Sequence, residues 1–347
     1  MKMETITHSR TASFKTCRKR HWYEYQIGLR TIIDAKALRF GSAFHAGLDC
    51  WKKTRDTDSA VEVVRNTYGT CPDQFDTETW DIEVETCASL CSAYAWRWGE
   101  SQHKIIASEL SFRLPLINPD TGAPSKLFEL AGKIDGIIEL EDGRLAVEEE
   151  KTCSEDIAIG SDYYRRLQID AQVTIYAYAA RQLGYDVSTV LWSATRKPTI
   201  KPTAVAITDE LGAKIVIDKY GSRAKTAKNE WRQTGNAAEG LILQTRPMTA
   251  AEWSEKLAND IGERPEYYFA RIEIPRLDSE IDEMLHELWD IQKTIRQAQI
   301  ENRWYRTVSF NTCPMCSYFG LCASKWTQLA GVPDGFQMVE NKHPELA

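Results

Sequence analysis

The stretch FELAGKIDGIIELEDGRLAVEEEKT, residues 128–152, decides the fold. Val, Ile, Leu and Phe fill the apolar positions of two runs, and Glu141-Asp142-Gly143 supplies a turn between them. Gly143 tolerates positive φ, so the stretch predicts two β-strands joined as a hairpin. Asp135 interrupts the first run, and an acidic segment followed by Lys151 ends the second.

The acids and the lysine of this hairpin form a candidate catalytic site. Side chains alternate across a strand, so Glu149 and Lys151 share a face with Val147, while Glu148 and Glu150 point to the other face. Two carboxylates suit Mg²⁺, and a lysine beside them suits an anionic substrate and an attacking water, as in phosphodiester hydrolysis. The alternative is a charged hairpin end with a surface ion pair. These residues alone do not decide between the two.

Length and composition set the class of protein. The chain has 347 residues, 43% of them hydrophobic, a net charge of −7 and a pI near 5.6. This acidic balance argues against a protein that coats nucleic acid nonspecifically, but it is compatible with an acidic metal site. No apolar run reaches about 18 residues and the N-terminus lacks a signal-peptide core, so we expect a soluble, cytoplasmic protein without a membrane partner.

Three of the nine cysteines have metal-ligand spacing near the C-terminus. Cys313, Cys316 and Cys322 form C-x2-C-x5-C, which needs a fourth ligand for zinc or an iron-sulfur cluster. Cys17 is a candidate fourth ligand, and it would fasten the two ends of the chain together. A basic and aromatic segment follows Cys17. It could hold a phosphate backbone and stack bases, or pack in the core, and both interpretations stay open: Arg18, Lys19, Arg20, Trp22 and Tyr23.

The remaining elements indicate an α/β sheet with parallel and antiparallel strands. Helices are expected at about 35–53, 58–69, 78–98, 163–183 and 279–304, and strands at 108–117, 188–197 and 266–275. Residues 207–264 are polar and mostly helical in pattern, with basic side chains that suit a solvated face better than DNA contact. His45, in the first helix, would ordinarily be a core or surface histidine.

Six motifs in order make the chain resemble a RecB-like nuclease of the PD-(D/E)XK superfamily, in the branch with an iron-sulfur cluster that includes the AddB nuclease domain and CRISPR-associated adaptation exonucleases. The motifs are a Ser/Thr-rich turn before Cys17, G-x-x-x-H at 41–45, G-x-x-D at 132–135, E-x-K-T at 149–152, Q-x-x-x-Y at 172–176 and the cysteine triad. Together they span residues 9–322. The C-terminal third also resembles phage-encoded nucleases.

The resemblance implies a role for each residue. His45, Asp135, Glu149 and the backbone carbonyl of Glu150 would bind Mg²⁺ or Mn²⁺, the imidazole making manganese at least as plausible. Lys151 would position or help deprotonate the attacking water and offset transition-state charge. Two further side chains would orient Lys151 or the nucleic acid: Gln172 and Tyr176. The four cysteines would hold a 4Fe-4S cluster, with zinc as the rival: Cys17, Cys313, Cys316 and Cys322.

The resemblance also implies one nuclease domain over residues 1–347 with a restriction-endonuclease-like core, a mixed central sheet flanked by helices. Its expected parts are a cluster-binding arm (1–30), a helical region (31–104), the catalytic core (105–206), a helical insertion (207–264), and a strand, long helix and cluster-binding loop (265–347). Glu148 and Glu150 depart from the family, which more often has apolar residues there, so the back of the strand end is expected to be more exposed than usual.

The expected function is metal-dependent cleavage of DNA, as an exonuclease on single strands in recombination, repair or phage DNA processing. The chain has no G-x-x-x-x-G-K-[ST] motif, so we do not expect it to unwind DNA. A helicase, recombinase or annealing protein is therefore an expected partner. The alternative is a DNA-binding or assembly component of a recombination complex with weak or no cleavage.

Overall fold

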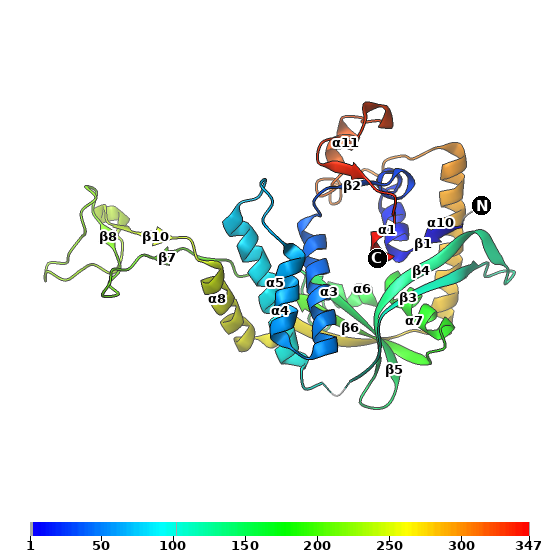
Figure 1. Ribbon diagram of the computed structural model, residues 1–347, viewed down its shortest axis with the longest axis horizontal. Helices are drawn as coiled ribbons and strands as arrows, with labels where there is room; N and C mark the ends of the chain where they lie inside the picture. The colour runs from blue at the N-terminus through cyan, green and yellow to red at the C-terminus, as the bar shows by residue number, and fades with distance from the viewer. Residues whose placement is uncertain (1–2, 102, 347) are drawn as a thin grey trace.

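The computed structural model describes residues 3–101 and 103–346. Its centre is a six-stranded sheet of described residues with the strand order β1-β4-β5-β6-β11, in which β3 also pairs with β4 (Figure 1). Two strand pairs are parallel, β1 with β4 and β5 with β6, and the others are antiparallel. The predicted mixed sheet is confirmed. The strands are β1 (Glu4–Ile6), β3 (Lys104–Ile117), β4 (Pro124–Glu139), β5 (Leu145–Cys153), β6 (Val187–Arg196) and β11 (Phe269–Pro275).

The predicted hairpin is formed by β4 and β5. Its turn is closed by the Leu140 backbone N–H, which donates to the Arg144 carbonyl at 2.8 Å. Gly143 has a φ of +85°, a conformation that glycine adopts without the steric cost of a Cβ. The strands pair from Glu139 opposite Leu145 to Gly136 opposite Glu148.

The sheet forks beyond that pairing. On one edge of β4, β1 pairs with residues 128–130 and β5 with residues 136–139, so no strand lies beside residues 131–135 there. Beyond Glu148, β5 pairs with β6 alone, Glu149 opposite Trp192 and Lys151 opposite Ala194. Asp135 thus lies where the two strands separate, with the E-x-K end of β5 beside it.

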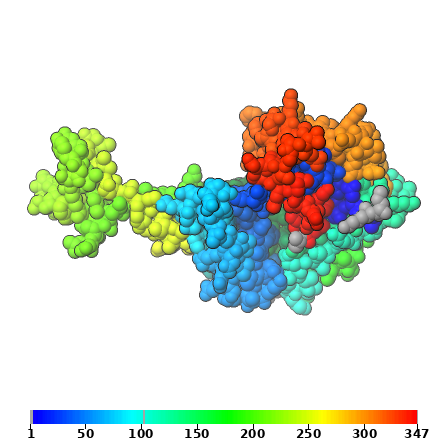
Figure 2. Space-filling view, turned by 45° about the horizontal axis from the view of Figure 1, so that its top comes forward, coloured from blue at the N-terminus to red at the C-terminus, as the bar shows by residue number. Residues whose placement is uncertain are grey.

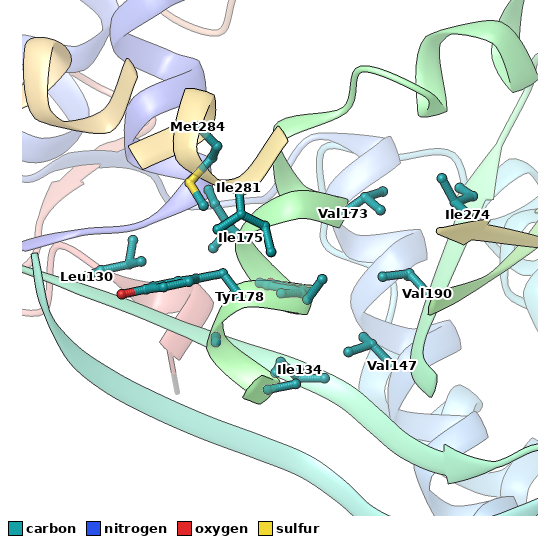
Figure 3. Packing of buried hydrophobic residues seen from close by; sticks show 14 of the residues in the cluster. Leu130, Ile134, Val147, Val173, Ile175, Tyr178, Val190, Ile274, Ile281 and Met284 are labelled. Carbon is teal, nitrogen blue, oxygen red and sulfur yellow. The ribbon is translucent and has the colours of Figure 1, made fainter. Parts of the chain in front are cut away.

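One face of the sheet is covered by α1 (His8–Thr16), α7 (Ala171–Gln182) and α10 (Asp278–Glu301). Their apolar side chains interdigitate with those of the central strands, as Figure 3 shows for Ile134 and Val147 against Ile175 and Ile281. Burial of this aliphatic layer is the main stabilising contribution on this face.

A helical bundle lies against the other face. It consists of α3 (Lys36–Thr54), α4 (Thr57–Tyr68), α5 (Thr77–Trp98) and α8 (Ala250–Glu263). Gly47 lets α3 approach its neighbours, because a Cβ there would come within 2.5 Å of Val64 and 2.9 Å of Cys91. The buried stripe predicted for α3 is present in the bundle core: Phe40, Phe44, Leu48 and Trp51.

The helix predicted over residues 163–183 is interrupted. It forms α6 (Asp162–Leu167) and α7, which begins after Asp170. The Asp170 carboxylate accepts hydrogen bonds from the backbone N–H groups of Gln172 and Val173, so it caps α7 and ends helical continuity before it. Gln172 consequently lies in the first turn of a new helix.

The helical insertion expected over residues 207–264 is wrong except for α8. Residues 205–246 form an arm of short strands that projects from the body (Figures 1 and 2): β7 (Val205–Ala206), β8 (Val216–Ile217), β9 (Ile242–Leu243) and β10 (Thr245–Arg246). Successive turns reverse the chain at residues with positive φ, namely Gly212, Gly221, Asn229 and Gly240. These residues favour turns over helix, which explains the error.

The two ends of the chain meet in one lobe, called here the end lobe: residues 17–31 and 302–339. In it, β2 (Leu29–Thr31) pairs with β12 (Phe336–Met338), and α2 (Arg18–His21) lies near α11 (Phe319–Ala323). The Tyr23 and Tyr318 rings stack with centroids 5.0 Å apart, and the Tyr318 hydroxyl donates to the Leu29 carbonyl at 2.8 Å. Among the described helices, none combines the length and the apolar character needed to cross a membrane.

Candidate active site

Asp135 is the centre of the site at the fork. The backbone N–H of Glu150 donates to Asp135 Oδ2 at 2.8 Å, which fixes the carboxylate across the gap between β4 and β5. His45, from α3, places its Nδ1 atom 3.7 Å from the same oxygen. Residues from three separate elements therefore converge on one carboxylate.

Glu149 and Lys151 share a face of β5, as the alternation predicts. Lys151 Nζ forms an ion pair with Glu149 Oε1, and Gln172 Nε2 donates to that oxygen at 2.7 Å. The Glu149 side chain is only 2% exposed, and its second oxygen, Oε2, is buried without a hydrogen-bond partner. A buried carboxylate oxygen without a partner is costly, and a cation would compensate it.

The electrostatics of the site show the same shortage of positive charge. Burial, together with the charge of Asp135, raises the pKa of Glu149 to about 8. Burial also raises the pKa of Glu150, against the opposing charge of Lys52. Desolvation lowers the pKa of Lys151, but the neighbouring Glu149 and Asp135 charges outweigh it and raise that pKa.

The donor set fits a divalent metal ion. His45, Asp135 and Glu150 each offer a ligand atom, and the three atoms lie within 4.8 Å of one another. Carboxylate oxygens with one imidazole nitrogen suit Mg²⁺ or Mn²⁺. The expected set contained the backbone carbonyl of Glu150 and the side chain of Glu149. Here the Glu150 side chain completes the group, while the Glu149 carboxylate is held by Lys151 and Gln172.

The back face of β5 is buried, so the prediction of unusual exposure is wrong. Glu148 and Glu150 are 4% and 2% exposed because Lys52, from α3, lies between them, 2.9 Å from Glu148 Oε2 and 3.2 Å from Glu150 Oε1. The Tyr94 hydroxyl donates to Glu150 Oε1 at 2.6 Å, and Arg271 donates to Tyr94 at 2.9 Å. Sequence reasoning missed Lys52, because its partners are about 100 positions away.

Gly132 and Tyr176 explain how α7 approaches the fork. A Cβ at Gly132 would lie 2.6 Å from the Phe112 ring and 3.3 Å from Tyr176, so a larger residue would displace the helix. Tyr176 is 9% exposed, and burial with the nearby Glu149 charge raises its pKa. Of the Q-x-x-x-Y pair, Gln172 contacts Glu149 directly.

His8 is a further residue near the site that the sequence did not indicate. Burial lowers its pKa, the charge of Asp170 raises it, and the charge of Lys151 lowers it. His8 is the first residue of α1, and its pKa is lowered overall. No motif in the first ten residues distinguishes this histidine.

The four cysteines with ligand spacing line one cavity of about 260 Å³ in the end lobe. The backbone N–H of Thr307 points at Cys17 Sγ and that of Ser309 at Cys313 Sγ, each at 3.4 Å. Such N–H···S contacts commonly surround thiolates that bind metal clusters. The cavity thus brings together all four predicted ligands: Cys17, Cys313, Cys316 and Cys322.

The predicted DNA contacts after Cys17 need one correction. Tyr23 is 1% exposed and stacks on Tyr318, so its ring packs in the lobe core and is not available to stack on bases. The Lys19 ammonium lies 3.7 Å from the centre of the Trp22 ring, Arg18 lies over Tyr305, and Arg20 pairs with Glu24.

A mixed sheet that forks at an aspartate, with E-x-K on the next strand and a helix covering it, defines the class of PD-(D/E)XK nucleases. The sequence profile of the PD-(D/E)XK nuclease superfamily matches residues 5–323, and the chain belongs to this superfamily. No curated protein sequence matches the chain significantly.

Solved structures that are similar to this chain include the following two. One is SSO0001, at 12% identity and a TM-score of 0.34, with 94% of this chain and 89% of that chain covered. The other is a candidate exonuclease from Eubacterium rectale, at 11% identity and a TM-score of 0.38, with 76% and 80% covered.

Proposed function

We propose that this protein is a metal-dependent deoxyribonuclease that hydrolyses phosphodiester bonds in single-stranded DNA, acting from an end. The observation that carries the proposal is the convergence of Asp135, Glu149 and Lys151 at the fork, where Glu149 keeps a buried oxygen without a partner. A surface ion pair would have no buried acid, so that alternative does not account for the geometry.

His45, Asp135 and Glu150, with Glu149 beside them, would hold Mg²⁺ or Mn²⁺. When bound, such an ion supplies Lewis acidity at a phosphoryl oxygen and a more acidic water. The cluster of acids with raised pKa values fits this role, because burial and the neighbouring carboxylates outweigh the charges of Lys151 and Lys52.

The chain's own residues orient the reaction. Asp135 is fixed by the Glu150 N–H, and Glu149 by Gln172, so both carboxylates are held before substrate binds. Lys151, about one-third exposed, can reach the scissile phosphate while remaining beside Glu149. Its ammonium would hold the attacking water in line and offset the negative charge that grows on the phosphoryl oxygens. Preorganised charge of this kind is worth about 100- to 1,000-fold in rate.

The end lobe would hold a 4Fe-4S cluster on the four cysteines. A tetrahedral zinc with Zn–S distances of about 2.3 Å needs sulfur atoms about 3.8 Å apart. In the described residues no three of these sulfur atoms lie within 4.8 Å of one another, although all four face the same cavity. The shared cavity supports a common metal centre, and the resemblance of the cysteine motif favours a 4Fe-4S cluster over zinc.

Metal analysis of anaerobically purified protein tests the cluster. We expect iron and acid-labile sulfide in equal amounts with visible absorption, all lost in Cys316→Ser. The Cys153→Ser variant is the control, because Cys153 lies outside the cavity. Stoichiometric zinc without sulfide would replace the cluster proposal with the zinc alternative.

The substrate and direction are tested with DNA labelled at either end. We expect Mn²⁺- or Mg²⁺-dependent release of short products from one end of single-stranded DNA, with blunt duplex cut more slowly. Internal fragments from circular single strands would contradict the exonuclease proposal and indicate an endonuclease. Binding without any metal-dependent cleavage would favour the alternative, a DNA-binding or assembly component.

A role in recombination, repair or phage DNA processing follows from such a substrate. The chain carries no helicase motif, so duplex DNA would have to be opened by another protein, such as a helicase, or be exposed by a recombinase or annealing protein.

A further inference from the structure

The end lobe contains a second concave site, which adjoins the cysteine cavity and shares Lys19, Arg306 and Cys322 with it, but shares no residue with the fork. It is an open groove of about 660 Å³ whose wall combines cations with aromatic rings. Its cations are Lys19, Arg306 and Lys325. Among the described residues that line the groove, none is an acid, and no ion pair involves these three cations. The groove is therefore a concentration of positive charge in a chain of net charge −7.

The aromatic wall presents a usable ring face. Tyr305 is 57% exposed, and the Arg18 guanidinium lies 4.4 Å from its ring centre, which holds the ring in place. Trp304 and Trp326 continue the wall, and the indole N–H of Trp326 is buried without a partner.

We propose that this groove binds a segment of single-stranded DNA, with phosphates on the three cations and at least one base stacked on Tyr305. Unpaired cations alternating with exposed aromatic faces are the arrangement by which proteins hold single strands. A duplex keeps its bases stacked inside, so its phosphates could reach the cations but its bases could not reach Tyr305. The assignment rests on the proposed nuclease function for its substrate class, and it adds a binding site whose lining shares no residue with the fork.

The test is binding of fluorescent oligodeoxythymidylate to full-length protein without divalent cations, so that no strand is cut. Tyr305→Ala should weaken binding about 5- to 100-fold, the range seen when one base–aromatic contact is lost, without changing the salt dependence. Tyr305→Phe keeps the ring and should bind like wild type. Arg306→Ala should lower the slope of log affinity against log salt by about 0.7, because one phosphate contact is lost.

Arg303→Ala is the matched control. Arg303 lies three positions from Arg306, is 78% exposed and pairs with Glu301, but it does not line the groove. The proposal is overturned if Tyr305→Ala and Arg306→Ala bind the oligonucleotide like wild type, or if Arg303→Ala loses as much affinity as Arg306→Ala. It is also overturned if Tyr305→Ala weakens binding of a blunt hairpin duplex as much as binding of the single strand. The binding assay does not depend on cleavage. A wild-type protein that binds the strand in this way but never cuts it would refute the nuclease proposal and support the binding groove.

Discussion

Glu150 connects the two faces of β5. Its backbone N–H fixes Asp135 at the fork, while one oxygen of its side chain, Oε1, is held by Lys52 and Tyr94. The buried acids are therefore compensated by Lys52 from α3, the helix that also supplies His45, and by Arg271, which lies 3.5 Å from Glu148 Oε1. Removing one partner from a buried charge group leaves the others without compensation, which is strongly destabilising.

Lys52→Met tests this dependence. Lys52 is 7% exposed, so its loss leaves Glu148 and Glu150 buried beside each other, and we expect the free energy of unfolding to fall by about 3–5 kcal/mol. The measurement is urea unfolding followed by circular dichroism. Lys53→Met is the control, since its exposed pair with Asp49 is worth at most about 1 kcal/mol. Equal effects of the two substitutions would show that the buried group does not depend on Lys52.

The sequence indicated the proposed catalytic residues but not the residues that hold them. Three polar residues interrupt the apolar pattern of the two strands: Asp135, Glu149 and Lys151. A charged residue at a position where the pattern predicts an apolar one can be recognised from the sequence. Lys52 and His8 lie in segments about 100 or more positions away, and nothing local distinguishes them from surface residues. Their roles follow only from the packing of α3 and α1 against the sheet.

The secondary structure predicted from the sequence is correct where the apolar residues have a clear period. The hairpin of β4 and β5 has alternating apolar residues and a glycine at the turn, and it forms where predicted. The arm has its apolar residues in short runs, such as Ile215-Val216-Ile217 and Leu241-Ile242-Leu243, and these do not form the sustained stripe of an amphipathic helix. Its spaced glycines and Asn229 were the turn signals that should have decided it.

The arm is structurally separable from the body. No residue between 201 and 247 belongs to either large apolar cluster of the described chain, and Ala206 pairs directly with Thr245 at the arm's base. Replacing residues 207–244 by an Asn-Gly turn should therefore change the unfolding free energy by less than about 1 kcal/mol, or about 2 °C in unfolding temperature.

Differential scanning calorimetry measures this change. Leu257→Ala is the positive control, because Leu257 is fully buried in the bundle and its truncation should cost about 2–5 kcal/mol. A shortened protein as unstable as Leu257→Ala would show that the arm packs on the body in a way that these contacts do not explain.

The N-terminal and C-terminal segments of the chain are joined in the end lobe. The β2–β12 pair and the Tyr23–Tyr318 stack join residues about 300 positions apart, beside the cysteine cavity. Closing a long loop lowers the entropy of the unfolded chain, so a cluster on the four cysteines would stabilise this closure further. The sheet and bundle have their own apolar cores and do not need the lobe.

Cys313→Ser should accordingly loosen the end lobe and leave the body folded. We expect limited proteolysis to cut after α10, between residues 302 and 340, at least tenfold faster than in the wild type, with peptide masses as the readout. Cys153→Ser should be cut like the wild type. Cleavage throughout the sheet in Cys313→Ser would show that the lobe holds the entire fold together.

The most direct test of the fork as the catalytic site is single-turnover cleavage of single-stranded DNA in the presence of Mn²⁺. Three proteins are compared: wild type, Lys151→Ala and Lys126→Ala. Lys126 is an exposed lysine on β4, away from the fork, and serves as the matched control. We predict metal-dependent cleavage by wild type and Lys126→Ala, and a loss of about 100- to 1,000-fold in Lys151→Ala with the fold intact. Unchanged cleavage in Lys151→Ala would contradict the assignment of the fork as the catalytic site.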